Sequence, residues 1–314
     1  MKTQKTLSSV AIAFAAVLAL ASCTQSDDIL ADGPKAVQFT AGIGEQAVAT
    51  PQTRAAGTEW NKNDAIGVFM VKNKETNIAS TYAGNKKFTL FKSNDFWPVS
   101  GNEIYYPLEE SNLVDFYAYY PYLATDGINI DSKIDVSTAD QTKQPEFDMM
   151  WAKADNTGSG YNKNFGGNIP LVFAHCLARL TMNCKLDPST GISGFTDQST
   201  VTIKGMNTAT TLAIKDGTLS AATKVADFKA RKATPTSGYD GTFDAIIVPA
   251  KYGANTVTVE FYVNSETYTW EMEATEFESG NDYVYEVIIT RTGIKANGTI
   301  IPWITKDQDK VYAE

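Results

Sequence analysis

The sequence predicts an all-β protein. Apolar and polar residues alternate in short runs throughout the chain, and Gly, Asn, Ser and Pro separate the runs. No stretch after the first 22 residues has the period of an amphipathic helix of several turns. Many short strands of this kind are typical of β-sandwiches, and 314 residues exceed one typical domain, so we expect two sandwich domains.

The clearest strands form a predicted hairpin in the C-terminal part. Residues 257–263 and 268–272 each alternate apolar and polar side chains, and Asn264, Ser265 and Glu266 form the turn between them. Such a pattern indicates an antiparallel sheet with one buried face and one face in water. Further strands are expected at 66–71, 114–120, 245–248 and 283–289.

The first residues have the pattern of a secretion signal. Two lysines precede the apolar run 10–21, which is too short to span a bilayer, and the run ends at Leu20, Ala21, Ser22 and Cys23. This tetrapeptide resembles the lipobox of bacterial lipoproteins, whereas the alternative is an ordinary signal peptide with a chance cysteine. We expect residues 1–22 to be removed, Cys23 to be acylated, and 23–35 to form a lipid-anchored tether. Residues 24–28 resemble the Ser/Asp-rich export tag that sends bacterial lipoproteins to the outer face of the cell outer membrane, which implies that the tether is anchored there.

Charge and linker composition set further limits. Loss of the leader's two lysines changes the formal net charge from -9 to -11, so phosphate backbones would repel the chain and nucleic acid is not an expected partner. The Pro/Gly/Ser-rich segment 187–194 is the predicted linker between an N-terminal domain, 36–187, and a C-terminal domain, 195–314.

The sequence predicts no catalytic, cofactor or metal site. His175 is the only histidine, and we interpret it as a packed strand residue rather than a general base. Cys176 and Cys184 fall on one face of a predicted continuous strand, 174–184, so we expect two buried thiols too far apart for a disulfide or a zinc site. The acids of 126–135 lack the spacing of a calcium loop.

Several short motifs resemble, in order and spacing, the Mfa-like fimbrillins, a family of pilus subunits of Bacteroides-type bacteria. The resemblance implies two transthyretin-like β-sandwich domains with Greek-key antiparallel sheets, export as a lipoprotein, and a place on the cell surface and in the fimbrium. The motifs are Cys23 and residues 60–69, 104–107, 115–122, 171–180, 277–285 and 300–303.

The resemblance also implies assembly by strand exchange. An arginine-specific protease would cut after the first strand, here 36–40, and the single basic residue of the following small-residue stretch is Arg54. A strand from the next subunit would then fill the opened groove. The C-terminal segment from Thr299 is the candidate donor, with Ile301, Trp303 and Val311 as anchors. Pro302 and the polar residues 306–310 equally suit a tip subunit that donates no strand.

Three functions stay open at this point. The first is a structural or adhesive pilin whose partners are other fimbrial subunits and a host or bacterial surface ligand. The second is a non-polymerising surface lipoprotein that binds glycans or host protein. The third is a surface hydrolase with an unrecognised pair of carboxylates.

Overall fold

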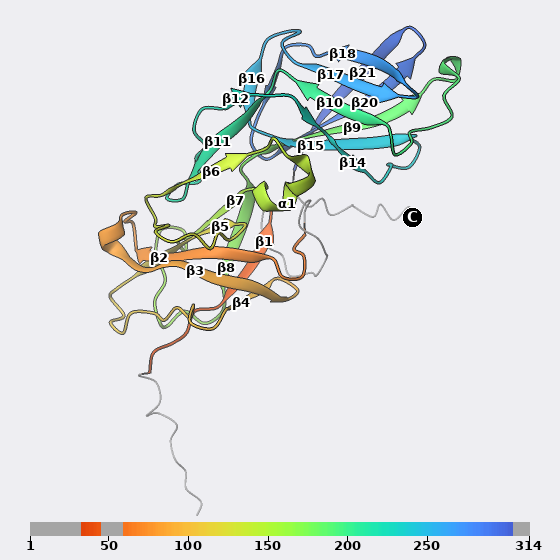
Figure 1. Ribbon diagram of the computed structural model, residues 1–314. Coiled ribbons are helices and arrows are strands. Elements are labelled where there is room, and N and C mark those ends of the chain that lie inside the picture. Colours follow the sequence, from red (N-terminus) through yellow and green to blue (C-terminus); the bar gives the residue numbers. More distant parts are fainter. Residues whose placement is uncertain (1–32, 45–58, 304–314) are drawn as a thin grey trace, which may run out of the picture. The chain divides into compact units, whose positions relative to one another are not determined.

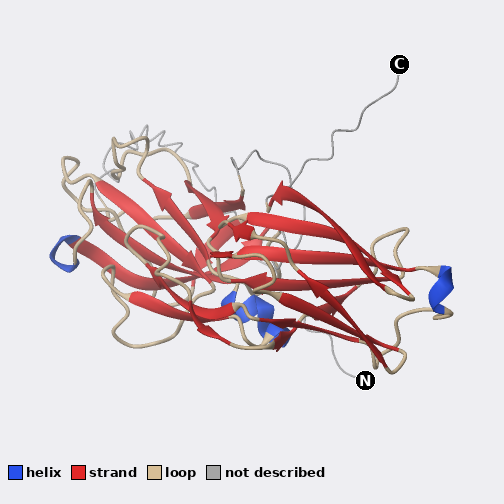
Figure 2. Cartoon of the chain, turned by 90° about the horizontal axis from the view of Figure 1, so that it is seen from above, coloured by secondary structure: helices blue, strands red, loops and turns tan. Residues whose placement is uncertain are grey.

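The computed structural model describes residues 33–44 and 59–303, whose elements all lie within one compact unit, Pro34–Glu314. Strands dominate, as Figure 2 shows, and the predicted all-β class is confirmed. No helix in the described part of the chain is long and apolar enough to cross a membrane. The helical elements are single turns: η1 (Ile78–Ser80), η2 (Gln141–Lys143), α1 (Gln144–Phe147) and η3 (Pro188–Thr190).

Seven strands of the N-terminal half close into a barrel (Figure 1). One continuous apolar core fills it, built from the inward residues of every strand. The sequence predicted a β-sandwich here. The strands close into a ring because the first strand bonds to a neighbour on each side. In barrel order the strands are β1 (Phe39–Ile43), β4 (Asp95–Pro98), β3 (Thr81–Lys92), β2 (Ala65–Lys72), β5 (Val114–Tyr120), β7 (Met150–Ala154) and β8 (Ile169–His175).

Two sheets of the C-terminal half share a second apolar core. The predicted hairpin is confirmed, because β17 and β18 pair in register from Thr258↔Glu271 to Val263↔Glu266. The first sheet is β13 (Phe228–Lys229), β10 (Thr200–Lys204), β17 (Thr258–Val263) and β18 (Glu266–Glu271). The second is β14 (Arg231–Ala233), β15 (Gly241–Ile247), β9 (Ala178–Leu186), β20 (Asn281–Thr290) and β21 (Gly293–Pro302).

A small third sheet joins strands from distant parts of the sequence. β6 (Lys133–Ser137) pairs with β11 (Asn207–Ala213), which also pairs with β12 (Thr223–Val225). The fourth, two-stranded sheet is β16 (Ala250–Tyr252) with β19 (Thr275–Phe277). The strand β9, which precedes the predicted linker 187–194, pairs with strands that follow it, and so does β6. Strand pairs thus connect the two sides of the predicted linker, and the domain boundaries stay a prediction.

Two expectations about strands are wrong. The sheets are not all antiparallel, because β1 runs parallel to β8, and β9 runs parallel to β20. Residue alternation reports which face a side chain occupies but not the direction of the neighbouring strand. The segment 174–184 is also not one strand: β8 ends at His175 and β9 begins at Ala178.

Cys176 lies in that break and Cys184 lies on β9, and both are buried and free. Burial raises the pKa of the Cys176 thiol to about 12 and raises that of Cys184 as well. A thiol with such a raised pKa stays protonated at neutral pH and is a poor nucleophile. The expectation of two buried, unpaired thiols is confirmed.

Candidate functional site

The first strand, β1, closes the barrel between β4 and β8. It forms a parallel ladder with β8 over five residue pairs, from Phe39↔Ile169 to Ile43↔Phe173, and pairs with β4 at two positions only. Backbone bonds of 2.8 Å connect Ala41 N–H to the Asn94 carbonyl and Ile169 N–H to the Gln38 carbonyl. Removal of β1 would leave unpaired backbone groups along the facing edges of β4 and β8.

The inward side chains of this segment are deeply buried. Val37, Phe39, Ala41 and Ile43 are between 0 and 9% exposed, and each alternates with a residue that faces outward. Phe39 is at the centre, with its ring edge-to-face against Phe88 and Phe116 at centroid distances of 4.9 and 5.2 Å. Val37 lies just before β1, where its N–H donates to the Ile104 carbonyl at 2.8 Å. We call the space that 37–43 occupies the first-strand slot.

Trp60 covers one end of the slot. Its indole Nε1 donates to the Ala41 carbonyl at 2.7 Å, and its ring meets Phe96 and Phe173 edge-to-face at 5.0 and 5.3 Å. The residue is 6% exposed. Trp60 follows residues 45–58 in the sequence. A residue that lines the first-strand slot therefore lies on the opposite side of the predicted cutting site, Arg54, from β1.

The chain's C-terminal described residues are held in their own subunit. Ile301 pairs with Asp282 at the end of the β20–β21 ladder, and Trp303 is 3% exposed. The Trp303 indole stacks flat on His175, with centroids 3.7 Å apart and planes 4° apart, and the backbone N–H of Trp303 donates to the Gly280 carbonyl. His175 Nδ1 lies 3.0 Å from Asp148 Oδ1. His175 is thus a packed residue that supports Trp303.

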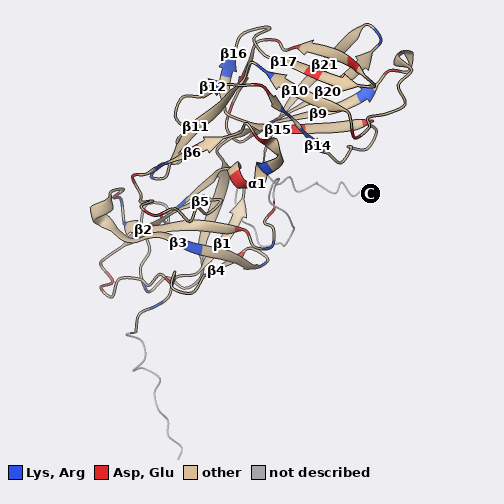
Figure 3. Cartoon of the chain, viewed as in Figure 1, with Lys and Arg blue, Asp and Glu red and all other residues tan. Residues whose placement is uncertain are grey.

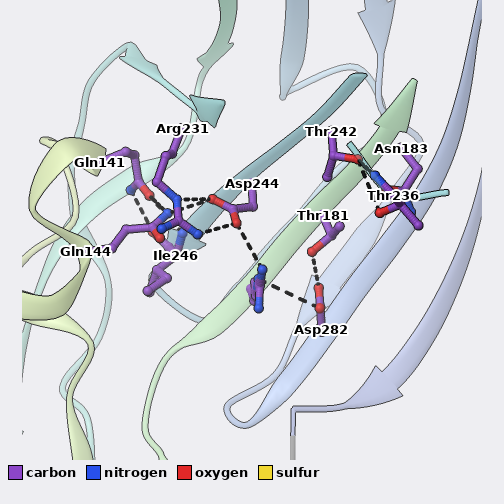
Figure 4. Close-up of polar contacts among 11 residues, drawn as sticks. Gln141, Gln144, Thr181, Asn183, Arg231, Thr236, Thr242, Asp244, Ile246 and Asp282 are labelled. Atoms are coloured by element: carbon purple, nitrogen blue, oxygen red, sulfur yellow. Dashed lines mark hydrogen bonds and ion pairs between the residues drawn. The ribbon is translucent and has the colours of Figure 1, made fainter. Parts of the chain in front are cut away.

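A buried polar network fixes the segment 141–144 to the β9–β15 sheet, as Figure 4 shows. The Gln141 amide donates to the Ile246 carbonyl at 2.8 Å and accepts from the Ile246 N–H at 2.9 Å, so it extends the sheet like a further strand residue. Gln144 Nε2 donates to Asp244 Oδ1 at 3.0 Å.

Asp244 is the centre of this network. Asp244 is fully buried. It accepts two hydrogen bonds from Arg231, at 2.6 and 2.9 Å, and one from Arg179, at 2.9 Å. Burial acts to raise the pKa of Asp244, but the hydrogen bond from Arg231 and the two guanidinium charges outweigh it, so the pKa is lowered. Arg179 also reaches Asp282 at 3.8 Å.

We expect Gln141→Ala to lower the free energy of unfolding by roughly 2–4 kcal/mol, because the N–H and C=O of Ile246 both lose their partner in a buried site. Urea unfolding followed by circular dichroism measures the change. Gln198→Ala, at an exposed loop position, is the matched control and should change the value by less than about 0.5 kcal/mol. Equal values for the two variants would contradict this role of Gln141.

A cavity of about 480 Å³ is lined by Trp151, His175, Cys176, Leu219 and neighbouring small residues, with no carboxylate in its wall. Among the buried carboxylates, Asp244 and Asp282 face arginine and threonine, whereas Asp148 contacts His175, which lines that cavity. Within 33–44 and 59–303, no three His, Cys, Asp or Glu side chains converge as metal ligands.

Comparison with known families identifies the family of this chain. The sequence model described as Fimbrillin-like matches residues 53–303. The chain belongs to the fimbrillin-like family. The resemblance drawn from short motifs is therefore confirmed, and this fimbrillin-like protein is a fimbrial or cell-adhesion subunit by family.

Relatives of the fimbrillin-like chain are described as fimbrial or cell-adhesion proteins. A Bacteroides uniformis protein named "Putative fimbrium subunit Fim1C" is 27% identical over 282 residues, covering 87% of this chain and 86% of its own. A structure from Bacteroides ovatus, described as a "putative cell adhesion protein", has a TM-score of 0.67 at 24% identity and covers 88% of this chain and 100% of its own. A similarly described structure from Bacteroides uniformis has a TM-score of 0.66 at 24% identity, covering 85% and 98%.

The structure brings together only part of the predicted site. Cys23, Arg54 and Val311 lie outside the described residues, so acylation, cutting and strand donation stay predictions. Phe39 and Val37 occupy the predicted inward positions, although β1 itself spans 39–43 rather than 36–40. Sequence reasoning missed Trp60 as a wall of the slot and Gln141 as a junction residue. A tryptophan at a loop end was the available signal for Trp60, whereas an isolated glutamine gives none.

Proposed function

We propose that this fimbrillin-like protein is a structural or adhesive pilus subunit whose first strand is cut away and replaced by a strand of a neighbouring subunit. The observation that carries the proposal is the way β1 is held. The side chains of β1 fill the centre of the barrel core, yet β1 pairs with β4 at only two positions.

The energetics favour an exchangeable strand. Burial of each large apolar side chain contributes roughly 1.5–3 kcal/mol, so an empty slot is costly and a replacement strand with apolar residues at alternate positions is strongly stabilised. After the cut, β1 would be a separate peptide without the advantage of covalent attachment. A tethered strand on a docked neighbour has a higher effective concentration and replaces it.

We further propose where the donor begins. Trp303 and Ile301 are engaged within their own subunit, so a C-terminal donor would start after Trp303, and the stack on His175 would fix the point where it leaves the fold. Val311 would then be its main apolar anchor. A tip subunit, which receives a strand and donates none, remains consistent with the same contacts.

Export follows the same proposal. Acylation at Cys23 would place the chain on the cell outer membrane, tethered by 23–35, before the protease acts. The cut at Arg54 would then couple release from the anchor with the opening of the slot, because Cys23 and β1 lie on the same side of Arg54.

Arg54→Ala tests the proposal. Residues 24–314 of the wild type, treated briefly with trypsin, should lose the N-terminal segment and form ladders of oligomers that resist heat in detergent. The Arg54→Ala chain should keep β1 and stay monomeric, while Arg291→Ala, which leaves the predicted cutting site intact, should form ladders like the wild type. Efficient ladders from the Arg54→Ala chain, or monomers only from the cut wild type, would contradict the proposal.

A further inference from the structure

Large apolar side chains are exposed on the strands around the first-strand slot. Phe91 and Trp97 are 56 and 44% exposed, and their rings stack with centroids 4.0 Å apart. Trp97 lies on β4, which borders β1, and the exposed Val172 lies on β8, which borders β1 on the other side. Tyr105, 48% exposed, forms a bridge with Ala36. We call Phe91, Trp97, Tyr105 and Val172 the slot rim.

Lysines without acidic partners flank this rim. Residues 76–94 carry Lys86, Lys87 and Lys92 and no Asp or Glu, although the chain as a whole has a net charge of -9. Figure 3 shows the basic colour on β3. None of the three forms an ion pair within the part of the chain that the structure describes; the Lys87 ammonium lies 5.2 Å from the Tyr122 ring centroid. The rim is therefore apolar at its centre and has these lysines beside it on β3, with Asp95 on β4 opposite Lys92 in the ladder.

A surface of opposite charge lies in the C-terminal half of the same chain. Residues 252–290 carry eight Asp and Glu and no Lys or Arg. Glu260, Glu276 and Glu286 pair with lysines outside this range, and Asp282 is buried. Glu271 and Glu273 form no ion pair within the described residues and are exposed near the end of the edge strand β18, and Tyr262, 42% exposed, adds an apolar contact on neighbouring β17. We call the exposed surface around Glu271 and Glu273 the acidic face.

We propose that the slot rim and its lysines dock onto the acidic face of a second copy of this chain. The proposal rests on the proposed function, because it places this contact beside the slot that receives a neighbour's strand. Both surfaces occur on one chain and differ from each other, so the contact is head-to-tail and repeats along an open filament. Complementary charge would bring the copies together before the slower strand exchange begins.

Cross-linking of the uncut chain tests docking without strand exchange. Residues 24–314 include the whole compact unit Pro34–Glu314, so the fold is retained. An equal mixture of ¹⁴N- and ¹⁵N-labelled chains is treated with a carbodiimide at low ionic strength, which joins contacting lysines and carboxylates. We expect mixed-isotope cross-links between Lys86 or Lys92 and acids of 252–290. Mixed cross-links that avoid these lysines, or none at all, would overturn the proposal.

The rate of ladder formation after trypsin treatment gives a second test. Lys86→Glu/Lys92→Glu should slow ladder formation about tenfold at low salt, and the difference should shrink at high salt. Lys133→Glu/Lys215→Glu makes the same change in net charge at exposed positions on and beside the β6–β11 sheet and should leave the rate near that of the wild type. Mixing the Lys86→Glu/Lys92→Glu chain with a Glu271→Lys/Glu273→Lys chain should restore it.

The outcomes distinguish docking of the slot rim from the strand exchange proposed above. Ladders that form equally fast in all variants would overturn docking and leave strand exchange standing. Absence of ladders in every chain, with the expected cross-links present, would overturn strand exchange and support docking. If Trp97→Ser abolishes glycan binding but leaves the cross-links and the rate unchanged, the rim is a sugar site and docking is overturned.

Discussion

Asp244→Ala should lower the free energy of unfolding by about 3 kcal/mol, because it leaves Arg179 and Arg231 without their shared buried carboxylate. The partial exposure of both guanidinium groups keeps the expected loss at the lower end of the range for broken buried ion pairs. Urea unfolding at pH 7 measures it. Asp197→Ala removes a fully exposed carboxylate 3.7 Å from Lys232 and is the matched control, with an expected change below about 0.5 kcal/mol.

The pH dependence of the same variant gives an independent measurement. The pKa of Asp244 in the folded state is lowered from an unfolded value of about 3.9, so its contribution is fully present above pH 4 and is lost as the pH falls through the folded value. Burial raises the pKa of Asp282, whose contribution therefore changes in the opposite direction. Wild-type stability should fall more steeply than that of Asp244→Ala below pH 4. Parallel curves would contradict the network.

Phe39→Ala is expected to cost about 3–5 kcal/mol of stability in the uncut chain, because the ring is fully buried against Phe88 and Phe116 and its loss leaves a cavity at the barrel centre. Gln38→Ala, on the exposed face of the same segment, should cost less than about 0.5 kcal/mol. After cutting at Arg54, the Phe39→Ala peptide should also leave the slot sooner, so that ladders appear earlier than in wild type. A small cost for Phe39→Ala would show that β1 does not complete the core.

The alternation of apolar and polar residues predicted most of the strands but not the closure of the barrel. The hairpin of β17 and β18 and the buried positions of Val37 and Phe39 were predictable because polar and apolar residues alternate there without interruption. The parallel pairing of β1 with β8 was not, since alternation carries no information about strand direction. The false continuous strand 174–184 has a similar cause: the chain bends at Cys176 and Leu177 while the apolar pattern continues.

The candidate site was predictable in outline only. A short apolar strand followed by a Gly/Ala-rich stretch with one arginine pointed to β1, whereas the residues that build its surroundings come from elsewhere in the chain. Trp60, for example, reaches the Ala41 carbonyl only through tertiary structure. Gln141 bonds to Ile246 and Gln144 bonds to Asp244, partners that lie 105 and 100 residues away in the sequence and are brought together only by tertiary structure.

The fate of the first strand is the most direct test of strand replacement. Oligomers formed after cutting are separated from free peptide by gel filtration, digested fully, and assayed by mass spectrometry for the peptide 36–54 against a peptide from β20. Replacement predicts far less than one copy of 36–54 per subunit in the oligomers, with the remainder in the free fraction. One copy retained in every subunit would show that β1 never leaves its slot and that the subunits join in another way.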